Sequence, residues 1–253
     1  MFQEYARSIA VVAFGFFALM GATAGAGAQS TPDYAALLAA PDRSDGDRQA
    51  DKRRDPLPLL ALAGVHPGMK VLDMGAGGGY STELMARAVG PTGKVFGQNA
   101  SNFERAVAAL EARTKTPAGR NITPLARPFD DPLPPEQRDL DLVTYFFFYH
   151  DTAYLMVDRA EMNRKLFAAL KPGGLMIVAD HSAKPGDGIN VARTLHRIEE
   201  SVLRREVEAA GFKLIEEGNF LRQPQDPRDF SVQPVTPTRP PVDEFVLKFQ
   251  KPQ

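Results

Sequence analysis

The chain has 253 residues, 43% of them hydrophobic, which is enough to form one sizeable core and gives no sign of disorder throughout. Its 30 basic and 31 acidic residues leave a net charge of -1 without a long basic block, which argues against nucleic-acid binding and favours a small-molecule partner. Cysteine is absent, which excludes disulfides, thiolate metal sites and a cysteine nucleophile.

The N-terminus has the pattern of a cleavable export signal. An uncharged apolar run, Ile9 to Met20, follows Arg7 and precedes a small-residue tract that ends in Ala26-Gly27-Ala28. We therefore expect residues 1–28 to be a signal peptide and the protein to be periplasmic or secreted. A retained anchor is the alternative, because residues 9–28 are just long enough to span a bilayer, and only then would the protein have a membrane partner.

Residues 29–64 are predicted to form a helical N-terminal cap on the main domain. Two apolar clusters, Tyr34 to Ala40 and Pro58 to Ala63, flank the very polar stretch from Asp42 to Asp55. The main domain is predicted to run from 65 to 253.

A glycine-rich turn follows the first predicted strand, Met69 to Met74, and leads into a helix over Tyr80 to Val89. The turn has the pattern acid-x-G-x-G-x-G, with Asp73, Gly75, Gly77 and Gly79. Glycines permit positive φ and close ligand approach, and they lie here at a helix N-terminus with unpaired N–H groups. A dinucleotide fingerprint would need glycine in place of Tyr80, and the P-loop lysine is absent. A purely structural turn is the alternative reading.

Further strands and helices alternate along the rest of the chain. Strands are predicted at Lys94–Gln98, Ile122–Ala126, Leu140–Phe148, Leu175–Ala179, Phe212–Glu216 and Glu244–Phe249, and helices at Asn102–Arg113, Thr152–Leu170 and Glu199–Ala210. A tight turn is expected at Leu170-Lys171-Pro172-Gly173-Gly174. This order predicts an α/β fold with right-handed crossovers and a parallel sheet. A proline-rich insertion, residues 222–242, reads either as a semi-rigid flap over a surface or as an exposed loop.

Three ordered landmarks resemble the class I S-adenosylmethionine-dependent methyltransferases. They are the glycine turn, the strand Asp141-Leu142-Val143, and Leu170-Lys171-Pro172-Gly173-Gly174. The segments "ADHSA" and "TLHRIE", together with a leader, are similar to a group of exported predicted methyltransferases of proteobacteria. The resemblance implies a doubly wound Rossmann-like sheet of seven strands, mostly parallel with an antiparallel last strand. It also implies S-adenosyl-L-methionine as cofactor and methyl transfer to a small molecule.

The resemblance also implies cofactor-binding roles. Asp73 would organise the turn and the methionine end of the cofactor, and the three glycines Gly75, Gly77 and Gly79 would pass beneath it. Asn99, with Gln98 as second choice, stands where the family usually has an acid that holds the ribose hydroxyls. An amide lacks the charge-assisted strength of that acid, so a non-catalytic module that binds a different small ligand is the alternative function.

An adenine contact is implied for Asp130, with Asp131 beside it. The alternative for both acids is a polar turn before Pro132.

The catalytic candidates follow the fourth and fifth predicted strands, because ligands of doubly wound sheets bind beyond the carboxyl ends of the strands. These candidates are His150 and His181, whose imidazoles would accept a proton from the methyl acceptor. The alternative for His150 is packing beside a helix capped by Asp151 or Thr152. His196 is predicted to lie on a surface helix, with folding back over the cleft as the alternative. His150, Asp180, His181 and His196 could together ligate a metal, but they lack a recognisable ligand spacing, so no metal site is predicted.

Overall fold

The computed structural model describes Met1, residues 31–236 and residues 238–253. The predicted signal peptide lies outside this range except for Met1, and so does the alternative of a retained anchor. Within the described residues, no helix combines the length and the apolar character needed to cross a bilayer.

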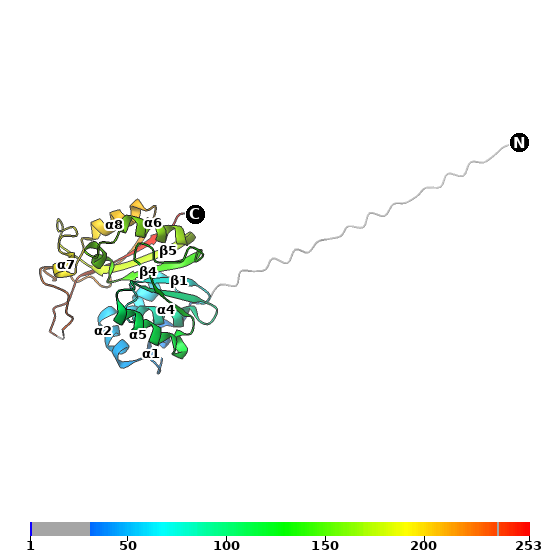
Figure 1. Ribbon diagram of the computed structural model, residues 1–253, viewed down its shortest axis with the longest axis horizontal. Helices are drawn as coiled ribbons and strands as arrows, with labels where there is room; N and C mark the ends of the chain where they lie inside the picture. Colours follow the sequence, from blue (N-terminus) through cyan, green and yellow to red (C-terminus); the bar gives the residue numbers. More distant parts are fainter. Residues whose placement is uncertain (2–30, 237) are drawn as a thin grey trace.

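The described residues form a seven-stranded sheet with the order β3-β2-β1-β4-β5-β7-β6 (Figure 1). The strands are β1 (Lys70–Met74), β2 (Lys94–Asn99), β3 (Ile122–Ala126), β4 (Leu140–Phe146), β5 (Leu170–His181), β6 (Lys213–Gly218) and β7 (Glu244–Gln250). The first five strands run parallel, and β7 runs antiparallel to both β5 and β6. The predicted fold class is therefore confirmed.

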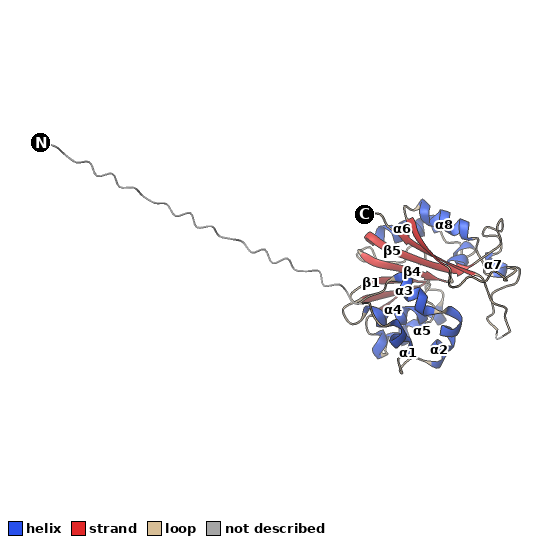
Figure 2. Ribbon diagram, turned by 180° about the vertical axis from the view of Figure 1, so that it is seen from behind, coloured by secondary structure: helices blue, strands red, loops and turns tan. Residues whose placement is uncertain are grey.

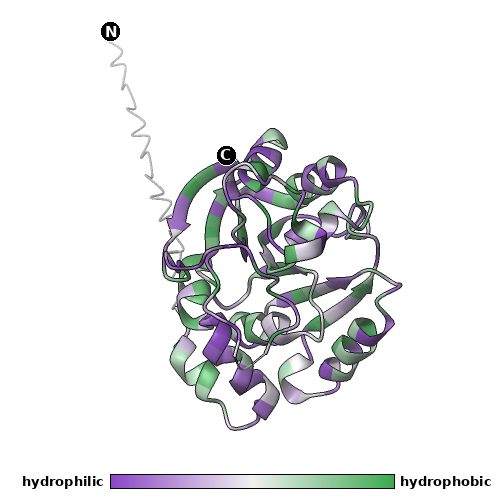
Figure 3. Ribbon diagram, turned by 90° about the vertical axis from the view of Figure 1, so that its left-hand side faces the viewer, coloured by the Kyte–Doolittle hydropathy of each residue, from purple (hydrophilic) through white to green (hydrophobic). Residues whose placement is uncertain are grey.

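Helices cover both faces of the sheet (Figures 1 and 2). One face carries α4 (Tyr80–Val89), α5 (Glu104–Thr114) and the N-terminal helices α1 (Tyr34–Ala39), α2 (Asp45–Arg54) and α3 (Pro56–Ala63), and the other carries α6 (Arg159–Ala169) and α8 (Glu200–Ala209). Several helices carry both hydrophobic and hydrophilic residues (Figure 3), as expected when one helix face packs on a sheet and the other faces solvent.

Strand β1 shows why the sheet has a core on each face. Val71 packs into the apolar cluster under the N-terminal helices, whereas Leu72 and Met74 pack into the cluster under α6 and α8. All three side chains are at most 1% exposed, as expected for a central parallel strand.

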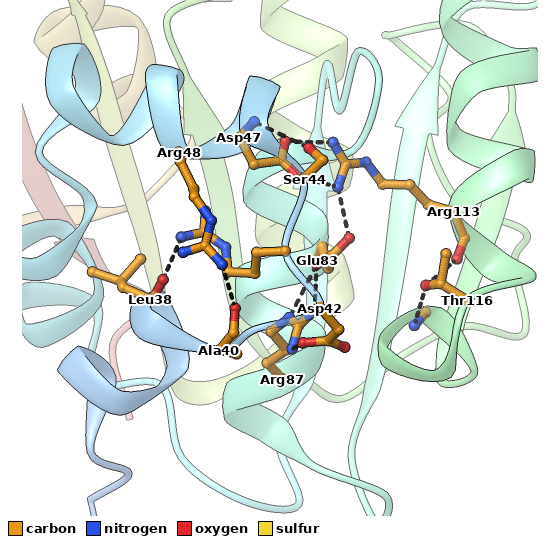
Figure 4. A network of polar contacts seen from close by, with 12 residues as sticks. Leu38, Ala40, Asp42, Ser44, Asp47, Arg48, Glu83, Arg87, Arg113 and Thr116 are labelled. Carbon is orange, nitrogen blue, oxygen red and sulfur yellow. Dashed lines mark hydrogen bonds and ion pairs between the residues drawn. The ribbon is translucent and has the colours of Figure 1, made fainter.

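Ion pairs fix the helical N-terminal segment on the domain (Figure 4). Arg113 of α5 pairs with Asp47 of α2 at 2.7 Å and with Glu83 of α4 at 2.6 Å. Arg87 of α4 pairs with Glu83 at 2.8 Å and with Asp42, in the loop before α2, at 2.9 Å. The helical segment thus packs as part of the domain and positions α2 beside the glycine turn.

The predicted helix over Thr152–Leu170 is wrong in its first turns. A 3₁₀ turn, Tyr149–Ala153, follows β4, and α6 begins only at Arg159. Asp158 starts the helix because its side chain accepts a hydrogen bond from Glu161 N at 2.9 Å, and Met156 before it has φ of +57°.

The predicted turn before the fifth strand is instead part of β5. Leu170 pairs with Leu140, and after a register shift Leu175 pairs with Leu142. Gly173, with φ of +77°, absorbs the irregularity, so the strand continues through the predicted turn.

The proline-rich segment contains no helix or strand among its described residues, yet it is anchored to the domain. Asp226 pairs with Arg197 at 2.8 Å, and both side chains are fully buried. The backbone N–H of Val232 donates to the carbonyl of Leu195 at 3.0 Å. These contacts fix the short helix α7 (Ala192–Leu195) and the residues that follow it.

Candidate functional site

Asp73, at the end of β1, links the glycine turn to α4 and β4 through side-chain hydrogen bonds. Its carboxylate accepts hydrogen bonds from Ser81 and Thr82 of α4 at 2.9 and 2.7 Å, and from Thr144 of β4 at 2.8 Å. The side chain is 1% exposed. Asp73 therefore organises the turn from beneath, through three hydroxyl donors.

Two glycines of the turn differ in their surroundings, because Gly79 packs closely against α5 and Gly77 faces open space. At Gly79, with φ of +82°, an added Cβ would lie 2.7 Å from Cδ of Arg113. At Gly77, with φ of +55°, an added Cβ would meet no described atom within 4 Å. A ligand can thus approach the Cα of Gly77 closely, as a cofactor cradle requires.

The two amides at the end of β2 hold the turn from the other side. Asn99 accepts from Gly77 N at 2.8 Å and donates to Gly77 O at 3.0 Å, so both polar ends of its amide are engaged. Gln98 accepts from Gly75 N at 3.2 Å and donates to the carbonyl of Arg127 at 2.7 Å. The ribose role of Asn99 stays a prediction, and it would require these contacts to break.

Replacing Asn99 with aspartate is expected to weaken the turn. A carboxylate can accept from Gly77 N but cannot donate to Gly77 O, and two oxygens about 3 Å apart repel each other. We expect a loss of about 1–3 kcal/mol in the free energy of unfolding, together with weaker cofactor binding. Thermal unfolding and calorimetry with S-adenosylhomocysteine measure both quantities, and tighter binding by the variant would show that the side chain is free to reach the ribose.

A cavity of about 420 Å³ opens beside the glycine turn. It is lined by the turn itself and by side chains from the N-terminal helices, the 3₁₀ turn and the residue after α7, including Arg54, Tyr80, Phe147, His150, Tyr154 and His196. Arg54 lies 5.2 Å from the ring centres of both Tyr80 and Phe147, and it forms no ion pair within the described residues. The cavity therefore combines an open backbone cradle, aromatic faces and a free guanidinium.

A larger groove of about 820 Å³ lies between α2 and the proline-rich segment. Its lining includes Lys52, Arg53 and Arg239. The glycine turn is not part of this groove, whereas it lines the smaller cavity.

His150 is held between two carboxylates. Its Nδ1 lies 2.7 Å from Asp180, its Nε2 lies 3.3 Å from Asp151, and its backbone N–H donates to Asp180 at 2.8 Å. Burial opposes protonation, but Asp180 and Asp151 outweigh it and raise the pKa of His150 to about 10. The imidazole is therefore already charged at neutral pH, which argues against a free general base, although its catalytic role stays a prediction.

His181 lies beside His150, with ring centres 5.6 Å apart, but it faces a separate small cavity. Its ring stacks on Phe147, and its Nδ1 lies 2.9 Å from Glu244 without a well-aligned hydrogen bond. Burial lowers the pKa of His181 to about 3. Its predicted role as a base is likewise untested, and its low basicity argues against it.

Glu244 is expected to make stability depend on pH. Burial raises its pKa to about 8, although Arg239 and Arg54 oppose the shift. The unfolded chain releases this proton near 4.5, whereas the folded chain keeps it to about 8, so stability falls as the pH rises between these values. The lowered pKa of His181 has the opposite effect, which is complete near pH 6.5, whereas the raised pKa of His150 adds a second fall between 6.5 and about 10. Stability therefore falls with rising pH above 6.5, and Glu244 contributes to this fall up to about pH 8.

Glu244→Gln should remove the share of this fall that Glu244 contributes, at most about 1.4 kcal/mol per pH unit, and should leave the share of His150 in place. Urea unfolding across this pH range, in the presence of a chelator, compares the variant with wild type and with the exposed control Glu111→Gln. Parallel profiles for wild type and Glu244→Gln would contradict the assignment.

His196 is not on a surface helix, contrary to the prediction. It follows α7 with φ of +53°, lines the cavity, and places Nδ1 3.3 Å from Asp151. Its ring lies 5.6 Å from that of His150, nearly perpendicular to it. The adjacent buried pair of Arg197 with Asp226 sets this position, and no local sequence signal reports such a long-range contact.

Asp130 is not brought to the cavity lining. Its carboxylate lies 3.4 Å from the backbone N of Asp158, and neighbouring Asp131 pairs with Lys165 at 2.8 Å. Phe129, just before it, stacks on Phe148 with ring centres 5.2 Å apart. The adenine role of Asp130 stays a prediction.

The comparisons with known proteins agree with this fold and turn. The sequence profile of a family described as "Methyltransferase domain" matches residues 65–217. The Ubiquinone/menaquinone biosynthesis C-methyltransferase UbiE of Burkholderia multivorans is 32% identical over 123 residues, which are 49% of this chain and 47% of that protein. The demethylmenaquinone methyltransferase of Staphylococcus aureus is 34% identical over 119 residues, 47% of this chain and 46% of that protein.

Among solved structures, a SAM-dependent methyltransferase from Aquifex aeolicus superposes with a TM-score of 0.59 at 17% identity, covering 83% of this chain and all of that one. The protein therefore belongs to the class I S-adenosylmethionine-dependent methyltransferases, whose cofactor is S-adenosylmethionine. The chain spans about half the length of the curated relatives it matches.

Proposed function

We propose that this protein transfers a methyl group from S-adenosylmethionine to a small molecule outside the cytoplasm. The proposal rests on one observation: a single cavity is lined both by the open side of Gly77 and by the polar cluster around His150. A volume of about 420 Å³ lies in the range of ordinary small-molecule sites. Cofactor and acceptor would therefore meet inside one cavity.

Residues of this chain supply the binding groups. The open side of Gly77 would receive the cofactor, and Arg54, which has no ion pair within the described residues, would hold its carboxylate. When bound, the cofactor supplies a methyl group on a positively charged sulfur, and the electron pair of the broken S–C bond stays on sulfur. Aligning the acceptor with that methyl group would supply most of the rate.

The neighbouring groove favours an acceptor with a negative charge. Lys52, Arg53 and Arg239 line it, and within the described residues none of these three side chains pairs with a carboxylate. Asp55 and Glu244 line it too, but the pKa of Glu244 is raised to about 8, so cationic side chains outnumber ionised acids at neutral pH. One relative is named for ubiquinone/menaquinone biosynthesis and the other for demethylmenaquinone, but the basic side chains of the groove favour an anionic acceptor for this protein. An acidic small molecule entering through the groove would lie beside Arg53 and Arg239, which also line the small cavity next to Arg54.

A non-catalytic binding module remains the second candidate, favoured by one observation. Asn99 uses both ends of its amide on Gly77, and no carboxylate replaces it at the end of β2. Such a module would bind a ligand in the same cavity without transferring a methyl group.

Export is part of the proposal and rests on the apolar run from Ile9 to Met20 with the small-residue tract after it. Cell fractionation followed by mass spectrometry of the N-terminus tests it. Cleavage after Ala28 in a periplasmic or secreted fraction is expected, and an intact N-terminus in the cytoplasmic fraction would contradict it.

The activity is tested with cofactor carrying a labelled methyl group and a metabolite extract from the native compartment. Label should enter a small acidic molecule with wild type. Gly77→Asn serves as the control, because asparagine tolerates positive φ and its side chain fills the open side of the turn. Labelling equal in both would contradict the site, and cofactor binding without any labelled product would favour the binding module.

A further inference from the structure

We propose that His150, Asp151 and His196 form a binding site for a divalent transition-metal ion, with zinc as the representative ion, at the wall of the cavity. Nothing about the family or the motifs assigns such a site, and no ligand spacing in the sequence reveals it. Metal binding stands by itself, whereas its use in activating a methyl acceptor rests on the proposed methyl transfer.

The three side chains place their ligand atoms together. One oxygen of Asp151 lies 3.3 Å from Nε2 of His150 and 3.3 Å from Nδ1 of His196, and all three atoms lie within 4.8 Å of one another. Two atoms bound tetrahedrally to one Zn²⁺ at about 2.0–2.2 Å lie roughly 3.4 Å apart. The two separations from Asp151 therefore match a shared ion, and the two imidazole nitrogens, which lie within 4.8 Å of each other, need only a small shift to bind the same ion.

His150 is oriented for this task by a second carboxylate. Asp180 lies 2.7 Å from Nδ1 of His150 and is itself fully buried. The backbone N–H groups of His150 and His181 donate to Asp180 at 2.8 and 2.9 Å, so this carboxylate cannot turn away. In the metal-free protein Nε2 also carries a proton, which a bound ion would displace to water. With the Nδ1 proton held by Asp180, the lone pair freed on Nε2 would then face the ion beside Asp151, as in carboxylate–histidine–metal arrangements.

His196 is held in place by a different set of contacts, those of the residue that follows it. Its left-handed backbone, φ of +53°, is followed directly by Arg197, whose fully buried ion pair with Asp226 fixes the chain. The imidazole therefore reaches Asp151 from a segment 45 residues away in sequence. His150 and His196 are thus held by separate contacts and both reach Oδ1 of Asp151, to which the Tyr154 hydroxyl also donates.

The donor set indicates the kind of ion. Two imidazoles with one carboxylate suit Zn²⁺, Fe²⁺ and similar ions better than Mg²⁺ or Ca²⁺, which prefer oxygen ligands alone. Three protein ligands leave at least one coordination position free, and His150, Asp151 and His196 all line the cavity. That position would face the acceptor.

The inferred acceptor class is a small molecule with a hydroxyl group beside its negative charge. The ion would polarise the hydroxyl and lower its pKa. The proton of the acceptor hydroxyl would pass to water. A lone pair on the acceptor oxygen would then form the new bond to the methyl carbon, and the S–C bond of the sulfonium would break with its electrons kept by sulfur. No base among the histidines is then needed.

The test is metal binding by the full chain after chelator treatment and dialysis. Titration with Zn²⁺ by calorimetry, and with Co²⁺ by visible absorption, should show one ion per chain. Asp151→Asn and His196→Ala should each weaken binding at least tenfold, and Asp180→Asn should weaken it about 10–100-fold through loss of orientation. His66→Ala, outside the cavity, is the matched control and should bind like wild type.

Thermal unfolding by circular dichroism shows that each variant is folded before its titration is interpreted. Absence of Zn²⁺ binding to wild type would overturn the proposal and would identify the cluster as an ion triad of His150 with its two carboxylates. Unchanged binding in both Asp151→Asn and His196→Ala would overturn it as well.

The same samples are titrated with S-adenosylhomocysteine to separate the two proposals. Cofactor binding without metal binding overturns only the metal site, and metal binding without cofactor binding supports the metal site while overturning the proposed function.

Discussion

Replacing Asp73 with alanine is expected to lower the free energy of unfolding by about 3–5 kcal/mol and to abolish cofactor binding. The substitution removes the one acceptor shared by Ser81, Thr82 and Thr144 in a site that is closed to water. Three buried hydroxyls then lose a partner, and the turn loses its link to α4 and β4. Urea unfolding and calorimetry with S-adenosylhomocysteine measure the two losses.

A graded control makes this result specific. Thr144→Val removes one of the three donors and keeps the side-chain shape, so it should cost only about 1 kcal/mol and leave cofactor binding measurable. Wild-type stability or wild-type affinity in Asp73→Ala would contradict the role given to this carboxylate.

Replacing Arg113 with alanine is expected to have the second-largest effect. Arg113 pairs with Asp47 and Glu83, whose side chains are only 9% and 8% exposed, and it also donates to the carbonyl of Gly78. Its loss leaves Asp47 without a cation and loosens α2 from the glycine turn. We expect a loss of about 2–3 kcal/mol, less than for a fully buried pair because Arg113 is partly exposed.

Limited proteolysis measures this second effect together with urea unfolding. Cleavage within residues 31–64 should accelerate in Arg113→Ala. The control is Arg204→Ala, which removes an exposed arginine that pairs with Glu208 at 3.3 Å and should change stability by less than about 0.5 kcal/mol. Equal proteolysis of wild type and Arg113→Ala would show that other contacts hold the N-terminal helices.

The sheet could be predicted from the sequence because its signals are local. Val71, Leu72 and Met74 form a short apolar run, and the glycines that follow end the strand and start the helix at Tyr80, as the structure has it. Helix α6 could not be placed correctly, because the 3₁₀ turn before it depends on how His150 is held by Asp180.

The site was less predictable because its geometry depends on contacts between distant segments. The resemblance implies a cofactor role for Asn99, which stays a prediction, whereas the engagement of Asn99 with Gly77 follows from the alignment of β2 with β1. His196 reaches the cavity only because Arg197 is buried against Asp226 in the proline-rich segment. The contacts of Asn99 with Gly77 and of Arg197 with Asp226 join residues at spacings that belong to no recognised sequence motif.

Calorimetry of the full chain with S-adenosylhomocysteine, compared with Gly77→Asn, tests the central claim that the cavity beside the glycine turn is the cofactor site. We predict saturable binding of one molecule per chain, lost in Gly77→Asn while the variant keeps its cooperative thermal unfolding. Absence of heat with wild type at millimolar ligand, or equal binding by the variant, would contradict it.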